Sequence, residues 1–473
     1  MKKLTHLLGA LIMLALPMQL MADNYDKYYQ NLPCQMTRPT LPVIPGNNVS
    51  VTDFGGVGDG ITLNTEAFRK AMSALDKQGG GHLNVPAGVW LTGPIAFKNN
   101  VDLHLEKNAI ILFSADKRLY LDIDKATGKI LGKSKPALNA SKRKNISITG
   151  QGIIDGNGKW WRPVKRSKVS DTEWSQFKAM GGTETEQGKL WFPFNLKNYK
   201  NVTATPEKEE KLRADLVRFT ECENILIQGV TFQNSPRFHV HPVRCKHLVV
   251  DGITILCPWN AQNGDGLDLS NCQNSLIVNN TVNVGDDGIC MKGGVGQAGV
   301  EAGPCENILI ENNTVYHAHG GFVIGSDVSG GMKNIVVRNN RFCGTDIGLR
   351  FKSSIERGGK TENIFISNIY MTDIIGEAIS FETTYADKGY SVSKDGNEKN
   401  AQPVKAPFSP DFGNMHISNI VCHGTESGIV AHGAEGMAHD IVIENSTIFY
   451  TKKATDIDAA CDVKLNNVRL LTY

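Results

Sequence analysis

The chain has 473 residues, of which 41% are apolar, and is therefore long enough to bury a large core. It carries 50 basic and 48 acidic residues, and loss of Lys2 and Lys3 with a leader would leave 48 of each sign. A neutral chain has no general attraction for nucleic acid, so no nucleic-acid partner is expected.

Met1 to Ala22 has the pattern of a secretory signal peptide. Lys2 and Lys3 precede an apolar run, and Ala22 stands at the expected cleavage point. The run is too short for a membrane span, and no similar run follows it. We therefore expect export to the periplasm or the extracellular space, a lead segment at 23–50 and one folded domain at 51–473.

An amphipathic helix is predicted from Thr65 to the glycines at 79–81. Its apolar positions follow the i, i+3, i+4, i+7 spacing and are Phe68, Ala71, Met72 and Leu75. Strand-like segments lie on both sides of it. A single helix at the start of a repeating array is expected to cap the open end of its core.

A nine-residue block recurs from residue 145 onward. It consists of Asn or Asp, apolar, any, apolar, any, Asn or Gly, any, any, apolar, as in NILIENNTV at 307–315. Blocks begin at Asn145, Asn224, His247, Asn274, Asn307, Asn334, Asn363, Asn414, Asp440 and Asp462. Most starts lie 22 to 33 residues apart, with strand-like alternation inside each block and no helical pattern between blocks. Such a period indicates a solenoid or a propeller.

Two further regularities select the fold. The sixth position of every block is Gly or Asn, the residues that adopt positive φ most readily. Two residues before six successive starts stand Cys222, Cys245, Cys272, Cys305, Met332 and Thr361, as in a stacked ladder. These features predict an all-β fold, a right-handed single-stranded parallel β-helix with an N-terminal capping helix. A propeller would need four strands per longer repeat, and a leucine-rich repeat would need its leucine spacing.

Ten cysteines in an exported chain would usually form disulfides. Here at least four occupy equivalent coil positions, where a small apolar side chain stacks in the core. The pattern favours buried free thiols. No C-x-x-C pair and no histidine cluster occurs, so we expect neither a metal nor a cofactor.

Charged strings gather in the middle of the chain: NGDG with Asp265, GDDG with Asp286 and Asp287, AHGG with His319, and LRFK with Arg350 and Lys352. Asp286 follows Asp265 by 21 residues and precedes His319 by 33, so each lies one coil from the next. Asp286 and His319 each lie twelve residues after a block start and so share one coil phase. Carboxyl groups, a histidine and an Arg-x-Lys pair in one groove suit acid–base chemistry on an anionic ligand.

In this order on a β-helix, the four strings resemble family 28 of the glycoside hydrolases, the polygalacturonases of pectin breakdown. The likeness runs from about Val51 to the C-terminus and includes DFGGVGDG, PAGVWLTGP and NSPRFHVHP. The family's Asn-Thr-Asp is matched by Asn263, Gly264 and Asp265, and its Gly-His-Gly by Ala318, His319 and Gly320. Both departures leave the chemical residues in place.

The resemblance implies inverting hydrolysis of the α-1,4-galacturonosyl linkages of pectin or polygalacturonate. Asp286 would be the general acid, Asp265 and Asp287 would share the attacking water, and His319 would orient or charge the site. The candidates for binding an acidic polysaccharide are Asn263, Lys292, Arg350, Lys352 and Tyr385. Because three carboxyl groups on adjacent coils cannot all ionise easily, the pKa of one should rise. A monomer is expected.

Other functions remain compatible with the fold. Rhamnogalacturonan or xylogalacturonan hydrolases are the nearest alternatives, followed by a calcium-dependent pectate lyase and a non-catalytic glycan-binding β-helix. Insertions at about 157–213 and 386–410 would fit either exo or endo cleavage. The first contains basic residues between Lys159 and Lys178 with Trp160, Trp161 and Trp174, which form either a solvated loop or a sugar-stacking lip.

Overall fold

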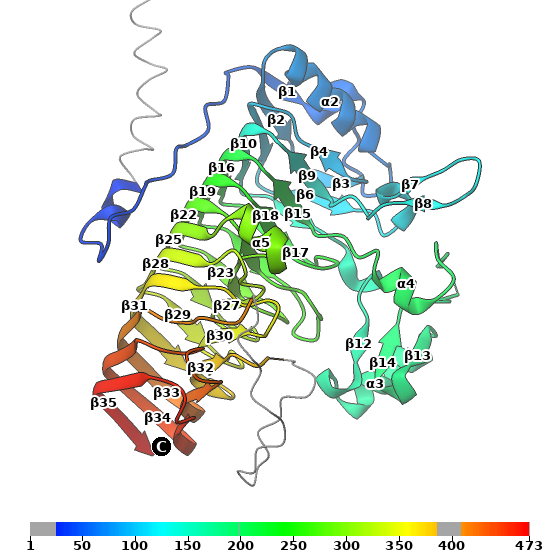
Figure 1. Ribbon diagram of the computed structural model, residues 1–473. Coiled ribbons are helices and arrows are strands. Elements are labelled where there is room, and N and C mark those ends of the chain that lie inside the picture. Colours follow the sequence, from blue (N-terminus) through cyan, green and yellow to red (C-terminus); the bar gives the residue numbers. More distant parts are fainter. Residues whose placement is uncertain (1–24, 198, 386–407, 473) are drawn as a thin grey trace, which may run out of the picture.

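The computed structural model describes residues 25–197, 199–385 and 408–472. A 30-stranded parallel sheet winds into a right-handed β-helix, and its coils stack along the long axis of the molecule (Figure 1). Successive coils pair in register, so that Ile308 lies between Ser275 and Ile335. The predicted fold class is confirmed. The predicted signal peptide and most of the 386–410 insertion lie outside the described residues.

The coils present three faces. The first contains β1 (Asn48–Ser50), β2 (Gly81–Val85), β5 (Val101–Leu105), β10 (Lys144–Gly150), β16 (Glu223–Gln228), β19 (Lys246–Asp251), β22 (Gln273–Val278), β25 (Cys305–Glu311) and β28 (Met332–Arg338). The second contains β3 (Gly88–Thr92), β6 (Ala109–Phe113), β11 (Ile153–Asp155), β17 (Thr231–Gln233), β20 (Thr254–Leu256), β23 (Thr281–Asn283), β26 (Thr314–Val315) and β29 (Arg341–Cys343). The third contains β4 (Ile95–Ala96), β9 (Leu138–Ser141), β15 (Val217–Thr220), β18 (Val240–Val243), β21 (Leu267–Ser270), β24 (Ile289–Lys292), β27 (Phe322–Ser326), β30 (Leu349–Ser353) and β32 (Glu377–Glu382).

Toward the C-terminus the faces merge into longer strands. These are β31 (Thr361–Thr372), β33 (Met415–His432), β34 (Ile441–Ile457) and β35 (Val463–Thr472). The short helix α5 (Gly296–Ala302) lies in the connection after β24, and β7 (Asp122–Ile123) and β8 (Ile130–Leu131) form a small antiparallel hairpin.

The predicted left-handed corners are present in all ten blocks. Positive φ occurs at Gly150, Gly229, Gly252, Asn279, Asn312, Asn339, Asn368, Asn419, Asn445 and Asn467. A second left-handed position, which we did not predict, occurs at nearly every block start, as at Asn307 with φ 55°. Asparagine suits both places because its short polar side chain tolerates this conformation, and asparagines of adjacent coils bond to each other, as Asn307 does to Asn274.

The cysteine ladder is confirmed as buried free thiols. Cys222, Cys245, Cys272 and Cys305 are fully buried at equivalent coil positions. All ten cysteines lie in the described residues and all are free. Burial raises the pKa of the Cys305 thiol to about 11, so this side chain packs as a small neutral group.

The predicted helix is α2 (Thr65–Lys77), and its apolar face is buried against the first strands. Figure 1 places it at the N-terminal end of the β-helix. Its role as a cap stays a prediction. The lead segment runs along the first face, where the Tyr25 hydroxyl donates to Asp251 at 2.9 Å. No helix in the described part of the chain has both the length and the apolar character that a membrane crossing requires.

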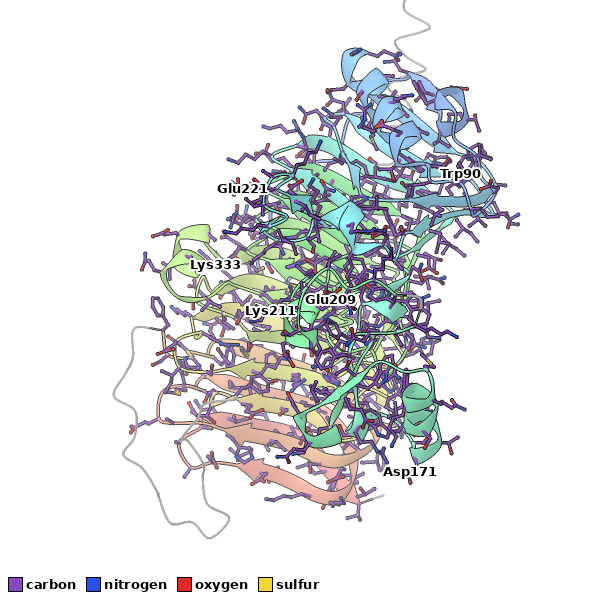
Figure 2. All side chains as sticks on the ribbon, turned by 90° about the vertical axis from the view of Figure 1, so that its right-hand side faces the viewer. Trp90, Asp171, Glu209, Lys211, Glu221 and Lys333 are labelled. Carbon is purple, nitrogen blue, oxygen red and sulfur yellow. The ribbon has the colours of Figure 1, made fainter. Side chains whose placement is uncertain are left out.

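The stretch at 157–213, called the insertion below, folds beside the coils. It contains α3 (Asp171–Ala179), α4 (Pro206–Glu210) and an antiparallel sheet of β12 (Val164–Lys165), β13 (Thr183–Thr185) and β14 (Leu190–Phe192). Figure 2 shows it facing the viewer, with Asp171 at its lower end and Glu209 near the middle of the molecule. Trp161 and Trp174 are buried, so these two rings serve packing rather than a sugar-stacking lip.

Candidate active site

The predicted carboxylates meet on the third face, at the points where its strands begin. Asp265 stands two positions before the first residue of β21, and Asp287 stands two positions before the first residue of β24. The amide of Gly266 donates to the carbonyl of Asp287 at 2.9 Å, and the amide of His319 donates to the carbonyl of Asp286 at 2.9 Å. The coil spacing therefore stacks these residues on adjacent rungs, as predicted.

Asp287 is held by two cations from β30. Lys352 donates to its Oδ2 at 2.8 Å, and Arg350 lies 3.5 Å from its Oδ1. Leu349 and Phe351 alternate with them and are buried in the core, so Arg350 and Lys352 both point outward from the same strand. Burial opposes ionisation of Asp287, but the charges of Lys352, Lys292 and Arg350 together outweigh it and keep the pKa of this carboxyl below its usual range. Asp287 is therefore ionised at neutral pH.

Asp265 and Asp268 share the Lys292 ammonium. The Lys292 Nζ lies 2.9 Å from Asp268 Oδ1 and 3.6 Å from Asp265 Oδ2, and both carboxyl groups are buried. Burial and the negative charges of Asp268 and Asp286 raise the pKa of Asp265 well above its usual value. The expected rise in one carboxyl pKa is present, and it belongs to Asp265.

Asp286 has the opposite environment. Its Oδ1 lies 3.2 Å from His319 Nδ1, and its Oδ2 accepts a hydrogen bond from the backbone N–H of Asn263 at 2.9 Å. Burial works against the charged form, but the hydrogen bond with His319 and the nearby charges prevail and lower the pKa of Asp286. In the free protein Asp286 is therefore a carboxylate, and its expected role as the acid stays a prediction.

The remaining candidates also lie at the site. The Tyr385 ring centroid lies 5.7 Å from the Arg350 guanidinium carbon and 5.4 Å from the Lys352 ammonium nitrogen. The Asn263 side-chain oxygen accepts from Arg213 at 2.8 Å, so this carbonyl is engaged by the protein. Lys352 is likewise committed to Asp287, and only 8% of its side chain is exposed. Arg350 is thus better placed than Lys352 to receive a ligand carboxylate.

Asp286, Asp287 and His319 offer ligand atoms that all lie within 4.8 Å of one another, a spacing that could suit a metal ion. The surrounding charges disfavour one. Lys352 and Arg350 already contact Asp287, so a divalent cation would meet two positive charges.

Four residues at the site were not singled out from the sequence. Lys168 of the insertion donates to His319 Nε2 and to the Gly285 carbonyl, both at 2.8 Å. Arg213 holds Asn263, and Asp346 Oδ2 lies 3.6 Å from His319 Nε2. His239 is fully buried and contacts the Asp265 carbonyl through Nδ1 at 2.8 Å. Lys168 belongs to the basic cluster noted in the sequence, but that cluster gave no sign of which member reaches His319.

Comparisons with known proteins identify the family of this chain. The model of the glycosyl hydrolases family 28 matches residues 164–405. The chain belongs to this family. It is 30% identical to a probable polygalacturonase of Vitis vinifera, over 88% of this chain and 77% of that one. It is 29% identical to the exo-poly-alpha-D-galacturonosidase of Dickeya chrysanthemi, over 89% of this chain and 70% of that one.

Among solved structures, the hyperthermoactive exopolygalacturonase of Thermotoga maritima is similar, with a TM-score of 0.72 and 30% identity. The alignment covers 92% of this chain and 94% of that one. A family 28 member is a hydrolase of glycosidic bonds, and paired carboxyl groups in a groove are what that reaction requires.

Proposed function

We propose that the protein hydrolyses the α-1,4-galacturonosyl linkages of pectic galacturonan with inversion at the anomeric carbon. The observation that carries the proposal is the joint placement of three carboxyl groups, Asp265, Asp286 and Asp287, beside the cations of β24 and β30. The carboxyl groups supply acid and base, and the cations supply partners for uronate. The names of the Vitis, Dickeya and Thermotoga relatives support the same substrate class.

Inversion requires one group to protonate the leaving oxygen and another to activate water on the opposite side of the sugar. Asp287 is suited to the base because the charges of Lys352, Lys292 and Arg350 keep it ionised. Asp286 is the proposed acid, with Asp265 helping to hold the water.

For Asp286 to act as an acid, its pKa must rise when substrate binds. Part of what lowers this pKa in the free protein is positive charge nearby, including that of Lys352. A uronate carboxylate bound at Arg350 would bring a negative charge into the same space and offset those cations. The substrate's own charge would thus favour the protonated form of Asp286. A neutral sugar would lack this effect.

Polygalacturonate digestion tests the function directly. We expect new reducing ends and saturated products without added calcium, and much slower cleavage of fully methyl-esterified pectin. Unsaturated, calcium-dependent products would indicate a lyase. Preference for rhamnogalacturonan or xylogalacturonan would assign the protein to those substrates instead. Binding without turnover would make it a glycan-binding β-helix.

Chemical rescue separates the acid from the base. In Asp287→Gly, azide should enter the space left by the base and give a glycosyl azide of inverted configuration. Asp286→Gly should recover only on substrates with an activated leaving group, because such a group needs no proton. Exchange of these two results would assign the acid to Asp287.

We also propose that the protein is exported and acts as a single catalytic domain from residue 51 onward. The signal-like pattern at 1–22 supports export. N-terminal sequencing of protein recovered outside the cytoplasm should begin just after Ala22.

A further inference from the structure

We propose that Lys168 is a positioning residue that holds His319 in its Nδ1–H tautomer, so that His319 donates a proton to Asp286 in a hydrogen bond and cannot accept one from it. This inference rests on the proposed function of Asp286 as the acid. Under this proposal the insertion takes part in the reaction, because it brings the Lys168 ammonium group to His319.

The contact of Lys168 with the ring defines the tautomer. A lysine ammonium has three N–H donors and no acceptor, whereas a neutral imidazole has one donor nitrogen and one acceptor nitrogen. Lys168 Nζ lies 2.8 Å from His319 Nε2, so Nε2 must present its lone pair. The ring proton then belongs on Nδ1, which lies 3.2 Å from Asp286 Oδ1.

Lys168 is well fixed for this role. A second proton of the ammonium goes to the Gly285 carbonyl at 2.8 Å, directly before the paired aspartates. Burial lowers the pKa of Lys168, and the charges of Asp286 and Asp346 act in the opposite direction. Burial has the larger effect, so the pKa of Lys168 is lowered overall, and the two carboxylates limit this fall.

Asp346 supplies the competing arrangement. Its Oδ2 lies 3.6 Å from the same Nε2, so without Lys168 it could accept an Nε2–H proton. The lone pair would then face Asp286, and the imidazole could take the proton that Asp286 needs for the leaving oxygen. Lys168 excludes that arrangement by occupying Nε2 with a donor. Wrong histidine tautomers are costly in other acid–base sites.

Nitrogen NMR of the imidazole ring tests the tautomer without turnover, at a pH where the ring is neutral. His319→Gln identifies the signals among the twelve histidines. The wild-type protein should show a protonated Nδ1 and a bare Nε2. In Lys168→Met the ring should shift toward the Nε2–H form. A wild-type ring with its proton on Nε2 would overturn the proposal, and this measurement needs no variant at position 168 to fold.

Kinetics on polygalacturonate provide the second measurement. Lys168→Met should lower kcat about 10- to 100-fold, the range seen when a metal-ligating histidine loses its outer hydrogen-bond partner, with little change in KM. Lys168→Arg, which keeps a cationic donor, should retain the Nδ1–H tautomer and most of kcat. Lys165→Met removes the same charge from an exposed position of the insertion and should change neither.

The two measurements must change together. A fall in kcat without a change of tautomer would mean that Lys168 contacts the substrate, and a change of tautomer with full kcat would remove its catalytic consequence. Either result overturns the positioning role. Failure of the wild-type protein to cleave polygalacturonate would instead refute the proposed function, and the ring spectrum would still report whether Lys168 sets the tautomer.

Discussion

Replacing Lys117 by methionine should loosen the insertion from the β-helix. The Lys117 ammonium lies 3.2 Å from Glu209 in α4, and the two side chains are only 2% and 4% exposed. Methionine removes the ammonium and leaves the carboxylate of Glu209 buried. Loss of one partner of a buried ion pair costs about 3 to 5 kcal/mol. Glu209 keeps the Thr203 hydroxyl and amide as donors, so we expect the lower end, about 3 kcal/mol.

The assay combines urea unfolding with limited proteolysis. Because the pair joins the insertion to the coils, Lys117→Met should expose residues 157–213 to cleavage at urea concentrations where the β-helix remains folded. Lys135→Met is the matched control. It breaks an ion pair between Lys135 and Asp122, whose side chains are both about half exposed, and should lower the free energy of unfolding by less than about 1 kcal/mol. In the double variant Lys117→Met/Glu209→Gln no unpaired charge remains, and the glutamine oxygen can still accept from Thr203, so part of the stability should return.

If Lys117→Met and Lys135→Met lose the same stability and expose the insertion at the same urea concentration, the unpaired charge of Glu209 is not the cause of the loss. The same conclusion follows if the double variant is no more stable than Lys117→Met. Either result would refute the assignment of this pair as the anchor of the insertion.

Three further predictions concern the site. Asp286→Asn, Asp265→Asn and Asp287→Asn should each lower kcat on polygalacturonate by a factor of about 1,000 or more without unfolding the protein. Near wild-type turnover in any of these variants would exclude that aspartate from the proton-transfer and water-activating roles. Arg350→Ala should raise KM for polygalacturonate with a smaller change in kcat. Lys352→Ala should lower kcat and stability as well, because the Lys352 ammonium pairs with buried Asp287. Steady-state kinetics and thermal melts distinguish the two variants. Asp265→Asn should stabilise the protein at pH 7. The raised pKa means that folded Asp265 holds a proton that the unfolded chain has released, so the stability of the wild-type protein falls as pH rises and the advantage of the variant shrinks toward acid pH. Urea unfolding at several pH values checks this, and an equal gain at all of them would contradict it.

The repeat made much of this architecture predictable. Asparagine or glycine at one position of each block identified the left-handed corner, and the spacing of Asp265, Asp286 and His319 placed them on adjacent coils. These inferences succeed because a solenoid converts sequence period directly into spatial position.

Two features of the site could not be predicted from the repeat: the residues that the insertion contributes, and which carboxyl group has the raised pKa. Lys168 and Arg213 reach the site from the insertion, whose fold has no repeat from which their direction could be inferred. Stacking of the carboxyl groups predicted that one pKa would rise, but which one depends on partners. Asp265 faces other carboxyl groups, while Asp286 receives a histidine and a backbone amide.

The stereochemistry of the first product tests the account most directly. Proton NMR of polygalacturonate during the first minutes of digestion distinguishes the α-anomer from the β-anomer at the new reducing end before they equilibrate. An acid at Asp286 and a water activated by Asp287 with Asp265 invert the α-linkage in a single displacement, here with one oxygen of Asp286 and one of Asp287 within 4.8 Å of each other, closer than the roughly 6.5 to 9.5 Å that is usual for inverting sites. The account predicts the β-anomer. Early formation of the α-anomer would contradict it, because retention requires one of these aspartates to attack the sugar itself.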